Sequence, residues 1–194
     1  MKTIKFNDHF NQTESVLTGH KTTMRRIIKL TEYDEVYLET AFDYDFRESV
    51  IIDEYAQYKV GEVIAILQSY HTVLEEMFAR DHGYKNPIYD PFRSQKPNLE
   101  EEKGWNNKRF VKAEYMPHRI KITDIRIERL QDIDEDDAQK EGIWYEDPFG
   151  WTYNELLHFD TPQEAFRALV GKTSRKGTWD RNPWVFVYEF KLIQ

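Results

Sequence analysis

Gly19-His20-Lys21-Thr22-Thr23-Met24-Arg25-Arg26 is the stretch around which we expect the fold to be organised, because it joins a helix to a strand. Before it, Phe10, Val16 and Leu17 recur at helical spacing, and its leading glycine stands where helices commonly end in a left-handed residue. Within it, residues 22–28 begin to alternate β-branched side chains with cations, which is typical of a strand. The connection between the two elements is therefore short.

Three cations of this stretch, Lys21, Arg25 and Arg26, gather positive charge in a chain whose formal net charge is −8. One interpretation is an anion-binding site. The other is a solvated basic edge that keeps a strand from pairing with other chains. The spacing of the cations leaves both interpretations open.

The pattern Gly19-x-Lys21-Thr22 followed by Arg26 resembles the ASCH domains, a branch of the PUA-like superfamily. Three further stretches resemble later blocks of that family in the same order: Tyr58-Lys59-Val60-Gly61-Glu62, the block from Met116 to Ile143, and the segment from Asn182 to Phe190. The resemblance is strongest to the larger versions carried by phages and prophages. It implies one α+β domain over residues 1–194, a PUA-like small mixed or antiparallel β-barrel with peripheral helices.

The function that this resemblance favours is binding of RNA or a modified nucleoside in a basic cleft formed by Lys21, Arg25, Arg26 and Glu141. A tryptophan beside amides and cations, as in Trp105-Asn106-Asn107-Lys108, suits stacking on an unpaired base, and its alternative role is to anchor a loop. The candidate ligand-binding residues are Lys21, Thr22, Thr23, Arg25, Arg26, Trp105 and Arg119.

Some small ASCH proteins are amidohydrolases that act on acetylated cytidine through a Lys-Thr-Glu set, which gives a second interpretation. Lys21 matches the family lysine and would activate the nucleophile, while Glu141 aligns with the glutamate and would be the base. The position of the family's second threonine is Met24. Thr23 is adjacent, but on a strand its side chain points to the opposite face from Met24. Lys21 and Glu141 are thus catalytic candidates without the family's hydroxyl.

Composition bounds these interpretations further. A hydrophobic content of 40% and an aromatic content of 15% predict an ordered globular core. The chain has no cysteine, which excludes disulfides and thiolate metal sites, and its six histidines show no paired metal-ligand spacing, so we expect no metal or other cofactor. No apolar run reaches the length of a membrane span and no leader pattern is present, which suggests a cytoplasmic protein without membrane contact.

Charge is unevenly distributed along the chain. Residues 31–57 hold nine acids against one arginine, and residues 103–121 hold six Lys or Arg against one acid. The acidic segment suggests a third interpretation, a phage-related module that binds a protein partner through this surface, although a solvated outer face explains the same charge. A partner protein is therefore possible, and the oligomeric state is open.

In the rest of the chain, hydrophobic periodicity and turn residues predict the secondary structure. Alternating apolar residues in segment 31–57 suggest half-buried strands, and residues 81–115 predict a loop-rich insertion that carries three prolines. A helix over 134–141, ended by Gly142, makes Glu141 its last residue, where a carboxylate next to a cation could act as a base or a hydrogen-bonding group, or could simply be exposed. Further expected elements are a strand over 63–67, a helix around 73–78, a bent strand over 119–130, a helix that starts at 161–164 and a strand over 184–192.

Overall fold

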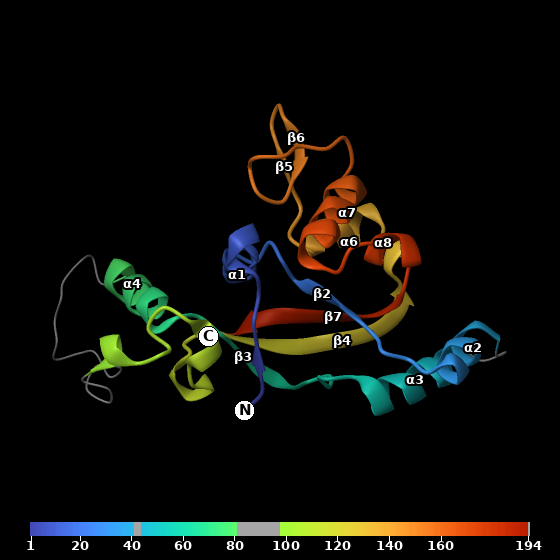
Figure 1. Cartoon of the computed structure of the whole chain (residues 1–194), viewed down its shortest axis with the longest axis horizontal. Coiled ribbons are helices and arrows are strands. Elements are labelled where there is room, and N and C mark those ends of the chain that lie inside the picture. The colour runs from blue at the N-terminus through green and yellow to red at the C-terminus, as the bar shows by residue number, and fades with distance from the viewer. Residues whose placement is uncertain (41–43, 81–97, 194) are drawn as a thin grey trace. The chain divides into compact units, whose positions relative to one another are not determined.

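The computed structural model describes residues 1–40, 44–80 and 98–193, which form a mixed α+β fold (Figure 1). Its strands are β1 (Thr3–Ile4), β2 (Thr23–Ile27), β3 (Val63–Ile66), β4 (Arg119–Arg129), β5 (Trp144–Glu146), β6 (Gly150–Thr152) and β7 (Trp184–Ile193). Its α-helices are α1 (Gln12–Leu17), α2 (Glu32–Thr40), α3 (Tyr44–Tyr55), α4 (Tyr70–Arg80), α6 (Glu135–Lys140), α7 (Pro162–Thr173) and α8 (Thr178–Arg181). Short 3-10 turns are Asp8–Phe10, Leu99–Glu101, Lys108–Phe110, Ala113–Tyr115 and Leu130–Asp132.

The chain divides into two compact units, and the smaller consists of residues 1–6, 63–120 and 193–194. Within it β1 runs parallel to β3, and the Ile66 amide of β3 donates a hydrogen bond to the His118 carbonyl at 3.0 Å. One face of α4 is buried as its helical spacing predicts, and it packs in a core of six residues: Ala65, Tyr70, Val73, Leu74, Leu99 and Met116.

The predicted insertion belongs to this smaller unit. Residues 81–97 lie outside the described residues, and residues 98–115 contain three 3-10 turns and no longer element, as a loop-rich segment should. Trp105 is half-buried against the core of this unit, and its ring meets that of His71 edge-on at 5.1 Å. This packing matches the anchoring interpretation of Trp105.

The larger unit consists of residues 7–62 and 121–192. In it β2 pairs antiparallel with β7, which places Thr23 opposite Glu189 and Arg25 opposite Val187. The hydrogen-bonded order of the five-stranded mixed sheet is β1-β3-β4-β7-β2, and β5 and β6 form a separate hairpin. Closure of the sheet into a PUA-like barrel stays a prediction.

The two faces of the sheet differ in the larger unit, because successive side chains of a strand alternate. Val185 and Val187 of β7 belong to a core that also contains Ala165, Phe166 and Leu169 of α7. The intervening Phe186 and Tyr188 are buried as well, and Tyr188 packs edge-on against Tyr58 at 5.4 Å. Both faces of β7 are therefore covered, as predicted for a central strand.

Strand β4 shows the predicted change of phase. Ile120 and Ile122 are buried, Thr123 and Asp124 are both exposed, and burial resumes at Ile125 and Ile127. Two consecutive exposed residues cannot belong to one regular alternation, so the strand changes the face that it buries at this point. In the second half of the strand the residues between the isoleucines are Arg126 and Glu128.

The prediction of strands in segment 31–57 is wrong, because this segment forms the helices α2 and α3. The signal that decides it is a cap: the Thr31 hydroxyl accepts the Asp34 amide at 3.2 Å, and the Thr31 amide donates to the Asp34 carboxylate at 3.1 Å. The rings of Tyr33 and Tyr37 then stack one turn apart at 6.3 Å. A short alternation of aromatics with acids fits a helix as well as a strand.

Candidate functional site

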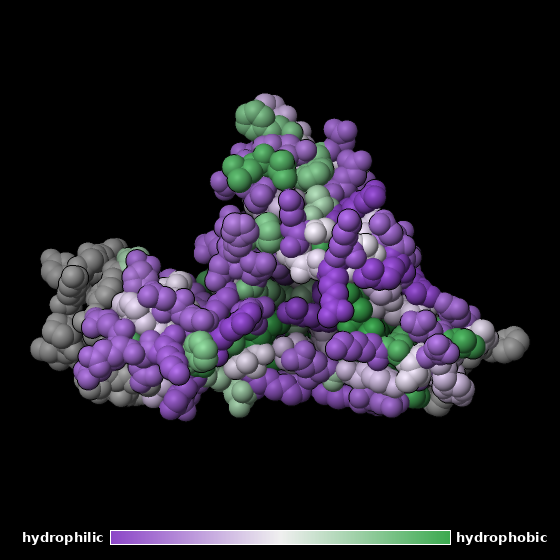
Figure 2. Space-filling view, viewed as in Figure 1, coloured by the Kyte–Doolittle hydropathy of each residue, from purple (hydrophilic) through white to green (hydrophobic). Residues whose placement is uncertain are grey.

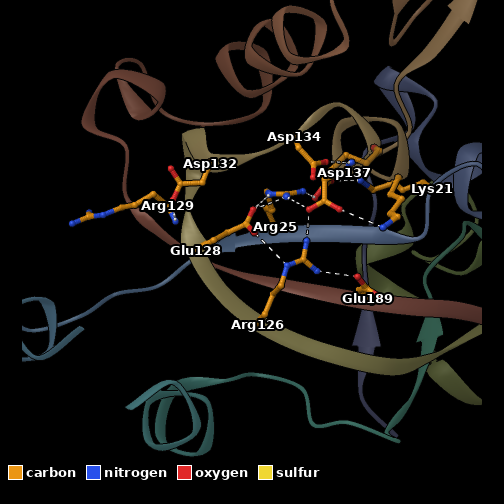
Figure 3. Close-up of polar contacts among 11 residues, drawn as sticks. Lys21, Arg25, Arg126, Glu128, Arg129, Asp132, Asp134, Asp137 and Glu189 are labelled. Atoms are coloured by element: carbon orange, nitrogen blue, oxygen red, sulfur yellow. Dashed lines mark hydrogen bonds and ion pairs between the residues drawn. The ribbon is translucent and has the colours of Figure 1, made fainter. Parts of the chain in front are cut away.

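Eight charged side chains meet above the β4-β7-β2 face of the larger unit, and we call them the ion cluster (Figure 3). Four are cations and four are carboxylates: Lys21, Arg25, Arg126 and Lys140, with Glu128, Asp137, Glu141 and Glu189. The strands supply four of them from one face of the sheet, Lys21 lies just before β2, and α6 and its C-terminal cap supply three. The formal charges sum to zero.

The innermost contact of the ion cluster joins the two residues that the sequence nominated as catalytic. Lys21 Nζ lies 2.5 Å from Glu141 Oε2 and also donates to the Glu141 carbonyl at 2.8 Å. Both side chains are almost fully buried, at 2% and 5% exposed. The backbones of the two residues form an antiparallel bridge, and the adjacent Thr22 amide donates to the Lys140 carbonyl at 2.8 Å.

Arg25 connects this pair to the rest of the ion cluster. Its guanidinium donates to Glu141 Oε1 at 3.1 Å, to Asp137 Oδ2 at 2.7 Å and to Glu128 Oε1 at 2.6 Å. The side chain is 2% exposed, and its guanidinium carbon lies 5.7 Å from the ring centre of Phe166 in α7. Three carboxylates around one buried guanidinium satisfy its donors and hold its charge.

The outer end of the ion cluster is open to solvent. Arg126 donates to Glu189 Oε1 at 2.9 Å and to Glu128 Oε2 at 3.3 Å, and it also forms an ion pair with Asp137. Its side chain is 29% exposed, and that of Glu189 is 36% exposed. The outer end of the ion cluster is thus one partly exposed guanidinium beside one partly exposed carboxylate, and the Lys140 ammonium, 47% exposed, is accessible as well.

Local sequence explains why α6 presents its carboxylates here. Asp134 caps the helix by accepting the Asp137 amide at 2.7 Å, and the acids of the first turn match the positive end of the helix dipole. The sequence predicted Glu141 as the last residue of the helix; α6 ends one residue earlier at Lys140, Glu141 is the C-cap, and Gly142 follows with φ of +90°. A Cβ at Gly142 would lie 2.7 Å from Ser15 Oγ and 3.3 Å from Lys21 Cβ, so α1 and α6 approach as closely as a glycine permits.

Burial and pairing shift the pKa values in the ion cluster in different directions. Desolvation lowers the pKa of the Lys21 ammonium below its ordinary 10.5 and outweighs the attraction of Glu141. For Asp137, desolvation raises the pKa, but the hydrogen bond from Arg25 and the charges of Arg126 and Arg25 outweigh it, so the pKa falls below 3.8.

The lowered pKa of Asp137 predicts a specific loss of stability in acid. A depressed carboxylate pKa contributes stability that is present above the unfolded value of 3.8 and is lost as the pH falls through the lower folded value. We expect the free energy of unfolding of the native protein to fall more steeply below about pH 4 than that of Asp137→Asn, measured by urea unfolding between about pH 3 and pH 6. Equal slopes would contradict an ionised, paired Asp137.

The structure brings some of the predicted site residues together and separates others. Thr23 lies opposite Glu189 and so shares the face of the ion cluster, and its hydroxyl oxygen is buried without a hydrogen-bond partner. Met24 is buried and lies opposite Tyr188, on the other face. Arg26 is exposed and follows Met24 by two residues, so it also belongs to that other face. The predicted grouping of three cations therefore holds for Lys21 and Arg25.

Two predicted ligand-binding residues belong to the smaller unit. Trp105 packs there as described above, and Arg119 is half-buried at the start of β4 with a buried Nε that has no hydrogen-bond partner. Their role in binding stays a prediction.

The sequence did not single out five members of the ion cluster for the site: Arg126, Glu128, Asp137, Lys140 and Glu189. A signal was present for Arg126 and Glu128, since charged residues alternate with buried isoleucines along β4 and so share one face. Asp137 lies within the helix predicted over 134–141, but helical periodicity alone does not mark it as a site residue. Glu189 interrupts an apolar central strand, and its role depends on pairings that periodicity does not reveal.

Comparisons with known proteins do not show a family for this chain. No family model matches it, and no curated protein matches it. Among solved structures, the chain is similar to the crystal structure of the protein EF3133 from Enterococcus faecalis V583, described with the family model DUF984. The sequences are 13% identical, the match covers 96% of this chain and 68% of that one, and the TM-score is 0.38.

In residues 1–40, 44–80 and 98–193 no helix is long and apolar enough to cross a membrane. Over the same ranges, no group of three or more His, Asp or Glu side chains has the geometry to hold a metal ion.

Proposed function

We propose that the chain binds RNA or a modified nucleoside and that the ion cluster reads the edge of one base. The observation that carries this proposal is the half-exposed pair of Arg126 and Glu189 at the outer end of a buried, charge-balanced network. A guanidinium beside a carboxylate offers donors and an acceptor side by side, as the edge of a nucleobase requires. Figure 2 shows a recess in the surface at the level of β2, below α6 and α7, through which a base could approach.

The charge balance of the ion cluster favours a base over a phosphate as the group recognised. Each buried cation already faces carboxylates, and Arg25 alone contacts three of them. A phosphate in this place would meet those carboxylates as well as the cations, and like charges in a partly desolvated site repel strongly. A neutral base that carries its own donors and acceptors avoids this cost.

The outer pair has hydrogen-bonding capacity left for a ligand. Arginine has five N–H donors, and Nε, Nη1 and Nη2 of Arg126 each serve one carboxylate. Two donors therefore remain for an acceptor such as a ring nitrogen or a carbonyl. Among the described residues, Glu189 Oε2 accepts no hydrogen bond, so it can take an exocyclic amine.

Arg126→Lys tests this proposal, because lysine keeps the charge and loses the planar fork. We expect affinity for the tightest binder of a panel of nucleosides and short single-stranded RNAs to fall about tenfold, since a bidentate contact to a base is worth roughly 1–3 kcal/mol. Isothermal titration calorimetry measures it, and Arg181→Lys, an exposed arginine of α8, is the matched control. No binder in the panel, or equal loss in both variants, would contradict the proposal.

Hydrolysis of an acylated nucleoside is a second candidate function, and one observation favours it. Burial lowers the pKa of Lys21, which increases the fraction of neutral amine that can take a proton from a hydroxyl. The hydroxyl on the same face of the strand is that of Thr23, which is buried and has no hydrogen-bond partner. Thr23 would therefore take the role of the threonine that the ASCH resemblance places at the position of Met24. The same proposal includes closure of the sheet into the PUA-like barrel of that family.

This arrangement predicts different results for two threonine variants. If the activity exists, Thr23→Val should reduce hydrolysis of acetylated cytidine by at least about a hundredfold, because it removes the nucleophile and keeps the shape. Met24→Thr should leave the rate unchanged, because residue 24 lies on the opposite face beside Tyr188. Product formation followed by liquid chromatography measures both rates. A gain of activity in Met24→Thr would contradict this assignment of the hydroxyl.

A further inference from the structure

The β5–β6 hairpin and the loop that follows it expose large apolar side chains. Leu156 is 81% exposed, Phe149 63%, Tyr145 54% and Leu157 46%. Figure 2 shows hydrophobic surface at the tip of the larger unit, where Figure 1 places the hairpin. Contiguous exposed apolar surface of this kind marks an interaction site, since single exposed side chains are scattered in ordinary surfaces.

The segment is held in a defined conformation. The Trp151 and Phe159 backbones form a bridge with hydrogen bonds of 2.9 and 2.8 Å, and the Tyr145 ring meets that of Trp151 edge-on at 5.4 Å. His158 Nε2 lies 2.8 Å from Glu146 Oε2, which ties the loop back to β5. A preformed apolar surface loses little entropy when a partner covers it.

The charge of this segment is of one sign. Residues 144–160 contain four acids and no lysine or arginine: Glu146, Asp147, Glu155 and Asp160. An open pocket of about 500 Å³ adjoins the loop and is lined by His158, Phe159, Asp160, Glu164, Arg167 and Ala168. Asp160 and Glu164 place two exposed carboxylates at this pocket, while Arg167 lies 4.0 Å from Asp180. A lysine or arginine can lay its aliphatic stem on Phe159 and Ala168 and its charge between those carboxylates.

We propose that this surface, defined as residues 144–160 with Glu164, binds a protein segment that combines basic and apolar side chains. Its apolar residues would cover Phe149, Leu156 and Leu157, and a basic residue would enter the pocket. Nucleic acid does not fit, because its phosphates would face four carboxylates. A second copy docked by the same surface does not fit either, since two such surfaces would repel. This proposal is independent of the one for the ion cluster.

Selection from a displayed library of random peptides tests the proposal on the full chain. We expect the native protein to enrich peptides that carry Lys or Arg together with Leu or aromatic residues, and we expect the enrichment to vanish for the double variant Leu156→Ser/Leu157→Ser. Both leucines are largely exposed, so the variant should fold. Val60→Ser, at a site that is 60% exposed, is the matched control and should select the same peptides as the native protein.

The enriched peptides then provide a quantitative test. Their affinity, measured by fluorescence anisotropy, should fall at least about tenfold in the leucine double variant and in Asp160→Asn/Glu164→Gln, and only the second change should flatten the dependence on salt. Enrichment of acidic peptides, no enrichment, or equal binding to all variants would overturn the proposal. Sedimentation provides another contradicting outcome: the native protein would be a dimer and the leucine double variant a monomer, because a second copy would then cover the surface.

Discussion

Arg25→Met should lower the free energy of unfolding by about 3–5 kcal/mol, one of the largest effects expected of a single change in this chain. The Arg25 guanidinium is the shared partner of Glu128, Asp137 and Glu141, and methionine fills its volume without its charge. Three carboxylates would then remain close together in a nearly buried site with less compensation, and that repulsion is the cost. Urea unfolding at neutral pH measures the effect.

The neighbouring Arg26 provides the matched control. It lies on the same strand, carries the same charge and is exposed, so Arg26→Met should change stability by no more than about 0.5 kcal/mol. Similar losses for the two variants would mean that the helix-to-strand connection, rather than the ion cluster, is sensitive to substitution. Raising the salt concentration should not rescue Arg25→Met, because buried charges are little screened.

Lys21 and Glu141 should show strong coupling in a double-mutant cycle of Lys21→Met and Glu141→Gln. Either change alone leaves a buried charge whose 2.5 Å contact is lost, and we expect each to cost about 3–5 kcal/mol. The double variant should cost less than the sum by about 0.5–3 kcal/mol, because the second change removes the charge that the first left unpaired. Unfolding free energies of the four proteins at one pH give this coupling energy.

Arg25 limits how large this coupling can be. It remains bonded to Glu141 when Lys21 is replaced, at 3.1 Å, so Lys21→Met should be the milder single change. Additivity to within about 0.3–0.5 kcal/mol would show that Lys21 and Glu141 do not act as a unit. It would contradict the assignment of their contact as the inner part of the ion cluster.

Sequence alone predicted the elements whose signals are local. The strand β7, the cap of α7 at Thr161 and the left-handed Gly19 all follow from residues within a few positions. Segment 31–57 was assigned wrongly because the prediction rested on its apolar alternation alone and did not use the Thr31–Asp34 cap. A cap of two hydrogen bonds fixes the first turn of a helix, whereas a few alternating residues are compatible with both periods.

The ion cluster was only partly predictable for a different reason. The pairing of Lys21 with Glu141 spans 120 residues and came from the family resemblance, because no local pattern links them. Arg126 and Glu189 meet because β4 and β7 are neighbours in this register, and a slip of one residue would place either on the other face. Cations are expected at the surface when only the sequence is known. Whether the fold buries them likewise depends on which carboxylates it brings close to them.

The most direct test of the central claim, that the ion cluster reads a base, is to follow the Nε–H signal of Arg126 by NMR. The tightest nucleoside or short single-stranded RNA of the panel is titrated into the labelled full chain, and Arg181 in α8 serves as the internal reference. The account predicts that the Arg126 signal shifts and saturates with the binding curve while the Arg181 signal stays in place. Saturable binding that leaves the Arg126 signal unmoved would contradict it.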